Sequence, residues 1–282
     1  MIGEHYFMDD PREASRLSRK VDPEQWVSKY LSRLLPRFGY ALEVGCGPGV
    51  IACAVARQRP TLTVTGIDIN PQRFAQNAAH LPRNLILREA DAVELPFVKG
   101  KFDVVYSRFL LEYLIDKQAA VNEMVRVCSV GGKVLLQDLD GQLLWHFPED
   151  AELQEGLHRI LDALAKRGFD PFVGRKLFSF CKLAGLNDIR VTAESYHLYA
   201  GPIDDHNLRL WQEKFDIVLP VAASVLGGES AALALRERFL KYLQRDDSLT
   251  YSVVFTVEGT KPMLDEQADA ASTPVDHPAL RP

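Results

Sequence analysis

The sequence is poor in cysteine, and this scarcity excludes two kinds of site. Its 282 residues include four cysteines, at positions 46, 53, 128 and 181, with no C-x-x-C pair among them. A disulfide framework or a structural zinc site needs cysteines at close and regular spacings. We therefore expect the cysteines to pack in the interior, since the alternative, a nucleophilic role, would require a nearby base.

The chain also lacks an excess of positive charge, a long apolar run and a leader pattern. Its formal net charge is -5, which gives no long-range attraction for the phosphates of RNA or DNA. No stretch approaches the length of a membrane span, and residues 1–5 lack a basic segment followed by an apolar one. These absences predict a cytoplasmic protein without a membrane span that acts on a small molecule, and they leave its oligomeric state open.

What the sequence does contain is a glycine-dense turn between an apolar run and a helical pattern. Residues 42–50 read Leu-Glu-Val-Gly-Cys-Gly-Pro-Gly-Val. Gly45, Gly47 and Gly49 allow a tight bend and a close approach to a ligand, and the following helix offers unpaired N–H groups. The G-x-G-x-G spacing differs from the G-x-G-x-x-G of dinucleotide dehydrogenases. The pattern predicts a nucleotide-binding turn, and a plain tight turn is the alternative.

An acidic residue ends the next apolar run. Residues 62–67 lead into Asp68, about twenty residues after the glycine turn, the offset at which a carboxylate accepts hydrogen bonds from ribose hydroxyls. Asp68 also stands shortly before Pro71, so an N-cap of the next helix is the alternative. We favour ribose binding, because the strand and the acid follow the glycine turn in order.

Predicted strands and helices alternate through the middle of the chain. The periodicity predicts helices over 49–58, 71–81 and 117–129, and strands over 62–68, 84–89, 102–107 and 132–138. Such alternation is typical of a parallel sheet covered on both faces, where ligands bind outside the carboxyl ends of the strands. The residues that follow these strands should therefore meet at one edge of the sheet.

Five short motifs recur in order along this region. They are 43–49 (Glu-Val-Gly-Cys-Gly-Pro-Gly), 66–68 (Gly-Ile-Asp), 90–92 (Ala-Asp-Ala), 102–105 (Phe-Asp-Val-Val) and 131–135 (Gly-Gly-Lys-Val-Leu). Together they resemble the class I S-adenosylmethionine-dependent methyltransferases over about residues 40–140, most closely the small-molecule branch typified by the ubiquinone and menaquinone C-methyltransferases. The resemblance implies a Rossmann-like, doubly wound α/β sheet of seven strands, mostly parallel with an antiparallel last strand, and S-adenosylmethionine as cofactor.

The resemblance also assigns cofactor contacts to residues at the strand ends. Gly45 and Gly47 would line the methionine portion of the cofactor, and Asp68 would hold its ribose. Asp91 and the Ala92 backbone would face the adenine, and the carbonyl region of Ser107 and the segment from Arg108 to Phe109 would touch the methionyl group and the site entrance. The other expected residues are Cys46, Ile69 and Glu43, the last acting through its neighbours without touching the cofactor. Arg108 departs from the family, which more often has His or Asn near this position, and this leaves the substrate side open.

Flanking elements complete the predicted organisation. We expect a helical lead-in over 1–38 with its helix over 11–35, a methyltransferase domain over 39–258, and a disordered tail over 259–282. Beyond residue 138 the patterns predict helices over 149–167, 171–184, 204–225 and 229–243, and strands over 188–198 and 249–257. The helices over 204–225 and 229–243 are extra to the smallest methyltransferases, so we interpret them as a substrate cap.

The chemistry that the resemblance implies is displacement at a methyl carbon bound to a positively charged sulfur. The protein then supplies orientation, exclusion of water and, where the acceptor must lose a proton, a general base. His146, on the loop expected after the strand over 132–138, is the first candidate base; a solvated surface histidine is the alternative. Asp138 and Asp140 are further candidates, and no metal is expected because no His, Asp or Glu set has ligand spacing.

Other residues are candidates for the acceptor side. Weaker polar candidates are Tyr6, Tyr113, His197, Tyr199 and His206, and an aromatic wall would consist of Phe7, Phe109, Tyr113, Trp145, Phe147 and Trp211. For each of these the alternative is ordinary packing or surface exposure. Arg16 and Lys20 on the lead-in helix could reach a carboxylate of the cofactor or substrate, with surface salt bridges as the alternative.

Three functions remain open from the sequence. We favour methyl transfer from S-adenosylmethionine to O, N or C of a small-molecule acceptor. The alternatives are a protein of the same fold that binds the cofactor without catalysis, and an NAD-dependent oxidoreductase. The last would require a G-x-G-x-x-G turn and a separate catalytic domain, and neither is evident.

Overall fold

Seven strands form one sheet in the computed structural model, which describes residues 11–75 and 81–263. They are β1 (Gly39–Val44), β2 (Leu62–Asp68), β3 (Leu85–Glu89), β4 (Phe102–Arg108), β5 (Cys128–Phe147), β6 (Asn187–Ala200) and β7 (Leu249–Thr260). Their spatial order is β3-β2-β1-β4-β5-β7-β6, with β1 to β5 parallel and β7 antiparallel to β5 and β6. This confirms the predicted α/β class with an antiparallel last strand.

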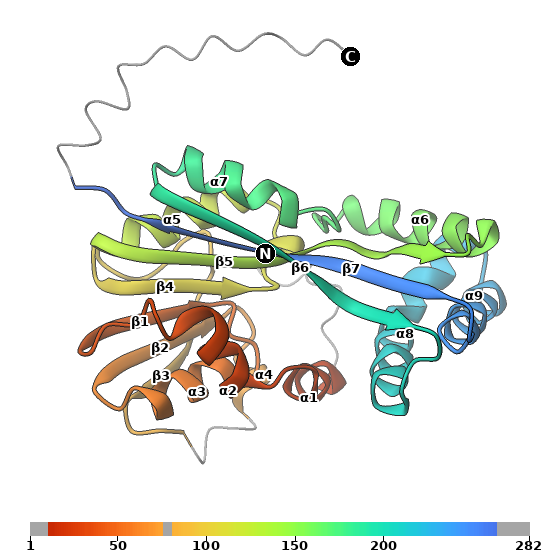
Figure 1. Ribbon diagram of the computed structural model, residues 1–282, viewed down its shortest axis with the longest axis horizontal. Coiled ribbons are helices and arrows are strands. Elements are labelled where there is room, and N and C mark those ends of the chain that lie inside the picture. Colours follow the sequence, from red (N-terminus) through yellow and green to blue (C-terminus); the bar gives the residue numbers. More distant parts are fainter. Residues whose placement is uncertain (1–10, 76–80, 264–282) are drawn as a thin grey trace, which may run out of the picture.

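Helices cover both faces of the sheet (Figure 1). They are α1 (Pro11–Lys20), α2 (Pro23–Trp26), α3 (Val50–Gln58), α4 (Gln72–Ala75), α5 (Lys117–Val127), α6 (Ala151–Ala165), α7 (Leu177–Leu183), α8 (Asp205–Leu226) and α9 (Glu229–Tyr242). Successive strand residues point to opposite faces, so Leu42 and Val44 of β1 pack with α5 and α7, whereas Ala41 packs with α2 and α3. Helices on both faces of the sheet thus enclose two hydrophobic cores, one on each face.

A third core lies around α6, α8 and α9, at the end of the molecule away from β1 to β3 (Figure 1). Leu153 and Leu161 of α6, Trp211 and Phe215 of α8, and Phe239 of α9 are buried here. The helices predicted over 204–225 and 229–243 correspond to α8 and α9. Among the described residues no helix is both long and apolar enough to cross a bilayer.

The single lead-in helix predicted over 11–35 is wrong. α1 ends at Lys20, and α2 begins at Pro23 after Asp22, whose side chain accepts a hydrogen bond from the Gln25 N–H at 3.0 Å. An Asp N-cap followed by proline at the first helical position starts a new helix, and proline disfavours helical backbone in the residue before it. The break lets α1 contact α4 and α8 while α2 packs against α3.

β5 is far longer than the strand predicted over 132–138. It spans 20 residues and pairs with β7 as far as Phe147. Gly141 has a φ of +74° at an irregularity in the β5–β7 register, and its N–H donates to the Pro171 carbonyl at 2.8 Å. Such a bulge bends a strand without ending it. The second half of β5 therefore runs beyond the parallel sheet toward α6, α8 and α9 (Figure 1).

Two other predicted helices are matched only in part by the described residues. α4 covers only the start of the helix predicted over 71–81, and residues 76–80 lie outside the described ranges. The helix predicted over 171–184 begins with a 3-10 turn at Gly174–Lys176 and continues as α7. Gly174 lies so close to β5 that an added Cβ would meet the Leu139 carbonyl oxygen at 2.9 Å.

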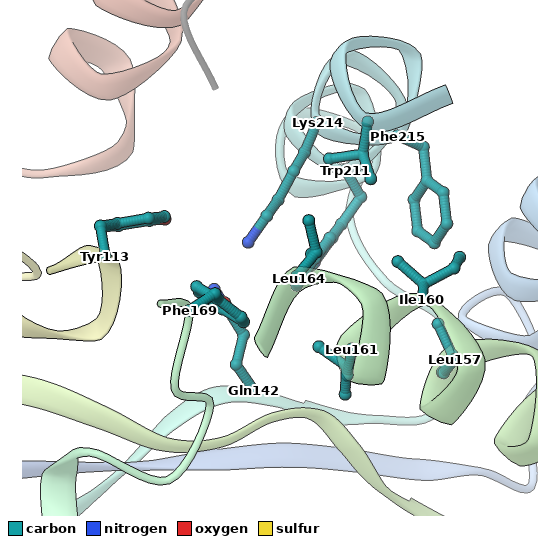
Figure 2. A pocket seen from close by; sticks show the side chains of 11 residues that line it. Tyr113, Gln142, Leu157, Ile160, Leu161, Leu164, Phe169, Trp211, Lys214 and Phe215 are labelled. Carbon is teal, nitrogen blue, oxygen red and sulfur yellow. The ribbon is translucent and has the colours of Figure 1, made fainter. Parts of the chain in front are cut away.

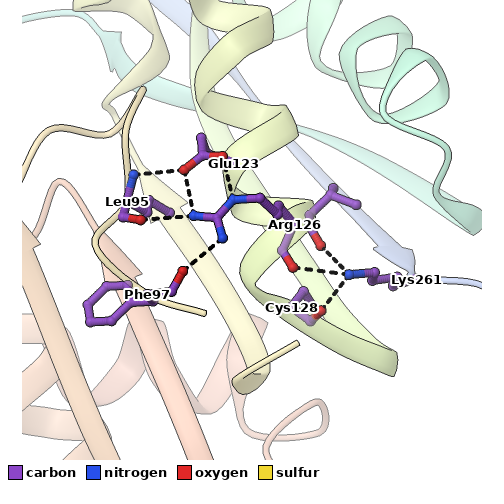
Figure 3. A network of polar contacts seen from close by, with 7 residues as sticks. Leu95, Phe97, Glu123, Arg126, Cys128 and Lys261 are labelled. Carbon is purple, nitrogen blue, oxygen red and sulfur yellow. Dashed lines mark hydrogen bonds and ion pairs between the residues drawn. The ribbon is translucent and has the colours of Figure 1, made fainter. Parts of the chain in front are cut away.

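Two cations join the end of α5 to its surroundings (Figure 3). The Arg126 guanidinium donates to the carbonyls of Leu95 and Phe97 at 2.8 Å and pairs with Glu123. The Lys261 ammonium donates to three carbonyls at the end of α5, of which the nearest is that of Cys128 at 2.7 Å. The expectation of disorder from residue 259 is therefore wrong for residues 259–261, because β7 and Lys261 hold them; residues 264–282 lie outside the described residues.

Candidate functional site

A cavity of about 400 Å³ opens at the carboxyl ends of β1 to β4. Its walls are the glycine turn after β1, the segments that follow β2, β3 and β4, and one face of α1. β1 lies between β2 and β4, so the sheet order reverses beside it, which is where open α/β sheets bind ligands. The strand ends predicted to meet at one edge do meet there.

The glycine turn has the backbone conformation that its composition suggests. Gly45, Gly47 and Gly49 have φ angles of +74°, +51° and +76°, in the left-handed region that side chains disfavour. A Cβ on Gly45 would meet Leu110 at 2.7 Å, whereas one on Gly47 would meet only Leu17, at 3.8 Å. Gly47 thus has room for a methyl group in ordinary contact with Leu17, and it lines the cavity.

Asp68 ties the end of β2 to this turn. Its Oδ2 accepts a hydrogen bond from the Gly47 N–H at 2.8 Å, and its Oδ1 accepts from the Asn70 N–H and from Arg73 Nη1, both at 3.0 Å. The carboxylate is buried and lines the cavity. α4 begins only at Gln72, whose N–H donates to Asn70 Oδ1 at 2.9 Å, so Asp68 does not cap this helix as the alternative interpretation expected.

Glu43, at the end of β1, is a buried acid on the cavity wall. Burial raises the pKa of its carboxyl group to about 8, against the opposing effect of a hydrogen bond from the Ala52 backbone. Its Oε2 is buried without a hydrogen-bond partner among the described residues. An unpaired buried carboxylate is costly, so a cation in the cavity would stabilise its charged form.

The remaining expected cofactor residues divide between the cavity and the sheet. Cys46, Ile69, Asp91, Ala92 and Arg108 line the cavity together with those already described. Ser107 does not; it is buried within β4. The other expected contacts thus gather around one space, although they come from four separate segments of the chain.

Arg108 and Phe109 shape the edge of this cavity. Phe109 has a φ of +53°, unusual for a residue with a large side chain. The Arg108 guanidinium lies 3.9 Å from the centre of the Phe109 ring and donates to the Tyr196 hydroxyl at 3.2 Å. Arg108 Nε is buried without a hydrogen-bond partner in the part of the chain that the structure describes. Arg108 thus carries a buried donor without a partner and also lines the cavity.

α1 brings two more cations to the cavity. Arg16 is buried and forms a bidentate pair with Glu13, with both contacts at 2.7 Å. Lys20 lies 5.0 Å from the centre of the Phe109 ring and 5.5 Å from that of Tyr196. Burial, followed by the charges of Arg16 and Arg108, lowers the pKa of Lys20 to about 7. Arg16 and Lys20 therefore line the cavity, with Arg16 also in an ion pair; their contact with a carboxylate of the cofactor or substrate stays a prediction.

Glu112 is a further cavity residue, which the sequence analysis did not single out. Burial raises the pKa of its carboxyl group, against the charges of Lys214 and Lys20. Its Oε2 has no hydrogen-bond partner among the described residues, and its N–H donates to the buried Asp138 carboxylate at 3.2 Å. Glu112 follows β4 on a short 3-10 turn, and no local pattern marks it as different from a surface acid.

A second cavity of about 250 Å³ adjoins the first, and both have Arg16 and Lys20 in their walls. Its other lining residues are Tyr196, His197, Leu198, Tyr199, Asn207, Leu210, Trp211 and Lys214. Burial and nearby cations lower the pKa of His197 well below its usual value, so the imidazole is neutral. Of the candidate acceptor residues, His197, Tyr199 and Trp211 lie in this cavity, and Phe109 and Tyr113 lie in the first.

The structure does not bring His146 to either cavity. Because β5 continues past residue 138, His146 lies in the strand instead of a loop, paired with Thr250 of β7. Its Nδ1 is 2.9 Å from the Thr250 hydroxyl, and its ring packs edge-on against Phe239 and Tyr242 of α9. The ring is 8% exposed, so it is also not the solvated residue of the alternative interpretation.

The other candidates are dispersed as well. Asp138 is buried in β5, and Asp140 pairs with Arg175 at 2.5 Å. Trp145 packs against Phe172 and Tyr251, away from the aromatic residues of the two cavities. Phe147 and His206 are exposed and line neither cavity, and Tyr6 and Phe7 lie outside the described residues. The single aromatic wall expected from the sequence is not assembled.

The structure also bears on the expectations for the cysteines and for a metal site. All four cysteines are buried and free, and burial raises the pKa of each thiol, which makes a reactive thiolate unfavourable. In residues 11–75 and 81–263, no three His, Cys, Asp or Glu side chains gather in an arrangement that would hold a metal ion.

Comparison with known proteins relates this edge of the sheet to one family. Residues 42–136 match the family described as Methyltransferase domain. The chain is 28% identical over 138 residues to methyltransferase str3 of Strobilurus tenacellus, with 48% of each chain covered. It is 31% identical over 171 residues to the malonyl-[acyl-carrier protein] O-methyltransferase of Herminiimonas arsenicoxydans, covering 56% of this chain and 64% of that protein. The chain thus spans about half to two thirds of the length of these curated relatives.

Solved structures share the fold at lower identity. The phosphoethanolamine N-methyltransferase 2 of Haemonchus contortus, solved in complex with S-adenosyl-L-methionine, superposes with a TM-score of 0.58 at 17% identity. The superposition covers 93% of this chain and 61% of that one. The similarity therefore extends past the matched family domain to most of the architecture.

Proposed function

We propose that this chain, whose core is a class I S-adenosylmethionine-dependent methyltransferase domain, transfers the methyl group of S-adenosylmethionine to O, N or C of a small-molecule acceptor. The observation that carries the proposal is the wall of the larger cavity, where the glycine turn, Asp68 and the unpartnered Oε2 of Glu43 face one space. A cytoplasmic location and the absence of a nucleic-acid substrate stay predictions from the sequence.

The cavity residues fit the charges of this cofactor. S-adenosylmethionine carries an ammonium group, a carboxylate and a methyl group activated by a positively charged sulfur. Glu43, with its raised pKa, suits a cationic neighbour, whereas Arg108 and Arg16 suit the carboxylate. Asp68 would accept the ribose hydroxyls, and Asp91 with the Ala92 backbone would face the adenine. Gly45 and Gly47 would let the backbone approach the methionyl portion.

Glu112 is our candidate for the general base. It lines the same cavity, and an acid whose pKa is raised toward neutrality is a more effective base near pH 7 than a surface carboxylate. When the acceptor loses a proton as it gains the methyl group, the Glu112 carboxylate would take that proton. We do not assign this role to His146, because it lies outside both cavities.

Calorimetry with the full chain tests the cofactor assignment. S-adenosylmethionine and S-adenosylhomocysteine should each bind with a dissociation constant in the micromolar range, and NAD should give no heat of binding. Binding of NAD without binding of either sulfur nucleoside would overturn the proposal.

A labelling experiment tests catalysis. Cell extract incubated with the protein and S-adenosylmethionine carrying an isotopic methyl label should yield a small product with the added mass, seen by mass spectrometry. Glu112→Gln should lower the product yield at least tenfold while the dissociation constant of S-adenosylhomocysteine stays within twofold. Cofactor binding with no labelled product in any extract would favour the alternative of a non-catalytic protein of this fold.

A further inference from the structure

The second cavity has an uneven distribution of charge. Arg16, Lys20 and Lys214 contribute three cationic side chains to its walls, and no Asp or Glu is among its lining residues. The nearest carboxylates belong to the walls around it: Glu13 is committed to Arg16, and Glu112 lines the larger cavity. The cavity is therefore positive in a chain whose net charge is negative.

Lys20 and Lys214 are the two cations left without an anionic partner. In residues 11–75 and 81–263, the structure shows neither a hydrogen bond nor an ion pair of their ammonium groups; their recorded contacts are aromatic rings, at 5.0 Å from Phe109 for Lys20 and 5.3 Å from Trp211 for Lys214. Lys214 is 8% exposed. Lysines are almost never fully buried unless they are paired, so the missing partner is expected to be a ligand.

Electrostatic effects agree with the geometry. Burial, followed by the charges of Lys20 and Arg16, lowers the pKa of Lys214 to about 7, against the opposing charges of Glu112 and Glu13. Burial and the charge of Arg16 also lower the pKa of Lys20. The two ammonium groups therefore act on each other, and an anion between them would relieve both the desolvation and the mutual repulsion.

The position of Lys214 relates the cavity to the cofactor edge. Its side chain extends from α8 and its ammonium points toward Tyr113 and Gln142 (Figure 2). Tyr113 also lines the larger cavity, and Lys20 lines both. A molecule held by Lys20 and Lys214 would therefore lie next to a bound cofactor.

The remaining walls describe the body of such a molecule. Tyr196, Tyr199, Trp211 and Leu210 provide aromatic and apolar surface, and Asn207 provides one amide. A third space, which shares Trp211 and Lys214 with the second cavity, is lined by Leu157, Leu161, Leu164 and neighbouring apolar residues, and holds only about 40 Å³. It has room for a few atoms, so the body of the ligand belongs in the cavity of about 250 Å³.

We propose that the methyl acceptor is a small acidic molecule with an aromatic or apolar body, whose carboxylate or phosphate is held by Lys20 and Lys214. This inference rests on the proposed methyl transfer, because it interprets the second cavity as the acceptor site. Lys214 is then a substrate-binding residue supplied by α8, and α8 acts as part of the acceptor site as well as a packing element.

Calorimetry with simple anions tests this inference. The full chain, saturated with S-adenosylhomocysteine, is titrated with benzoate, with phenyl phosphate and with the neutral benzamide. Benzoate or phenyl phosphate should bind at least tenfold more tightly than benzamide, and the tighter of the two anions identifies the charged group. Lys214→Met, which keeps the volume of the side chain, should weaken anion binding at least tenfold.

Two controls separate the possible failures. Lys241→Met removes an exposed lysine of α9 and should change neither affinity. Lys214→Met should leave the affinity for S-adenosylhomocysteine within twofold, because Lys214 does not line the larger cavity, and this also shows that the variant is folded. Binding of benzamide as tight as that of both anions, or unchanged anion binding in Lys214→Met, would overturn the inference. Absence of S-adenosylhomocysteine binding to the unmodified chain would instead count against the proposed function.

Discussion

The Gly47 N–H donates a 2.8 Å hydrogen bond to Oδ2 of Asp68, which joins the turn after β1 to the carboxylate at the end of β2. Two neighbouring parallel strands thus present a backbone without a side chain and an acid at one point. Both residues line the same cavity, so the bond preorganises the wall on which the proposed cofactor binding depends.

Replacing Asp68 tests that wall directly. Asp68→Ala should weaken S-adenosylhomocysteine binding about tenfold to a hundredfold, because hydrogen bonds to a charged group contribute roughly 1.5–3 kcal/mol. Calorimetry measures the affinity and circular dichroism checks the fold. Asp247→Ala, which removes an exposed acid paired with Arg245, is the matched control. An affinity equal to that of the unmodified chain would show that the ribose assignment is wrong.

Two glycines of the turn should respond differently to alanine. Gly47→Ala adds a methyl group that contacts Leu17 without a clash, so we expect a stability loss of about 1 kcal/mol from the left-handed backbone. We also expect a large loss of cofactor affinity, because Gly47 lines the cavity. Gly45→Ala also meets Leu110 at 2.7 Å and should destabilise the fold more. Urea unfolding measures the two stabilities. The reverse order of stabilities would contradict this account of the turn.

The buried Glu43 makes stability depend on pH. Its folded-state pKa of about 8 lies above the ordinary value of 4.5, so its contribution is fully present below pH 4.5 and is lost as the pH rises through 8. Glu43→Gln mimics the protonated form. The variant should match the unmodified chain near pH 4 and exceed it by about 1–3 kcal/mol above pH 8, as expected for relief of a buried unpaired charge. A constant difference across this range would argue against the raised pKa.

The contribution of Lys214 to stability should depend on pH in the opposite direction. Its pKa is lowered from 10.5 to about 7, so stability is greatest above pH 10.5 and decreases as the pH falls through 7. Without ligand, Lys214→Met should therefore be more stable than the unmodified chain by about 1–3 kcal/mol below pH 7, with the gain shrinking toward pH 10.5. Lys241→Met should stay within about 0.5 kcal/mol at every pH. Denaturant unfolding at several pH values measures both, and a destabilised Lys214→Met at pH 6 would count against a buried unpaired cation.

Lys261 should stabilise the junction of α5 and β7. Its ammonium donates to the carbonyls of Val125, Arg126 and Cys128, and Lys261→Met would leave them without this donor. We expect a loss of about 1–3 kcal/mol in the free energy of unfolding, with cofactor affinity unchanged because Lys261 lies outside the cavity. A loss of affinity larger than the loss of stability would mean that this junction reaches the site in some other way.

The cofactor edge was predictable because its signals are local. The glycine turn, Asp68 and Asp91 each stand directly after an apolar run, and parallel strands place their carboxyl ends together. The order of the motifs was enough to predict one edge; Ser107 is the exception, since it is buried in β4 and does not line the cavity.

The acceptor side was not predictable in the same way. The sequence around Asp138 and Gly141 reads as the end of a strand, yet pairing with β7 carries β5 on to Phe147 and moves His146 under α9. That pairing depends on residues about a hundred positions away, which no local pattern specifies. Glu112 and Lys214 look like ordinary surface charges until the fold buries them.

The sequence by itself determined the α/β class and the nucleotide edge, because helix and strand periodicity and glycine conformation are properties of short segments. Tertiary structure alone decided where the cations of α1 and α8 meet and how far β5 extends. Burial and charge proximity arise from contacts between distant segments, so the chemistry of the second cavity exists only in the folded chain.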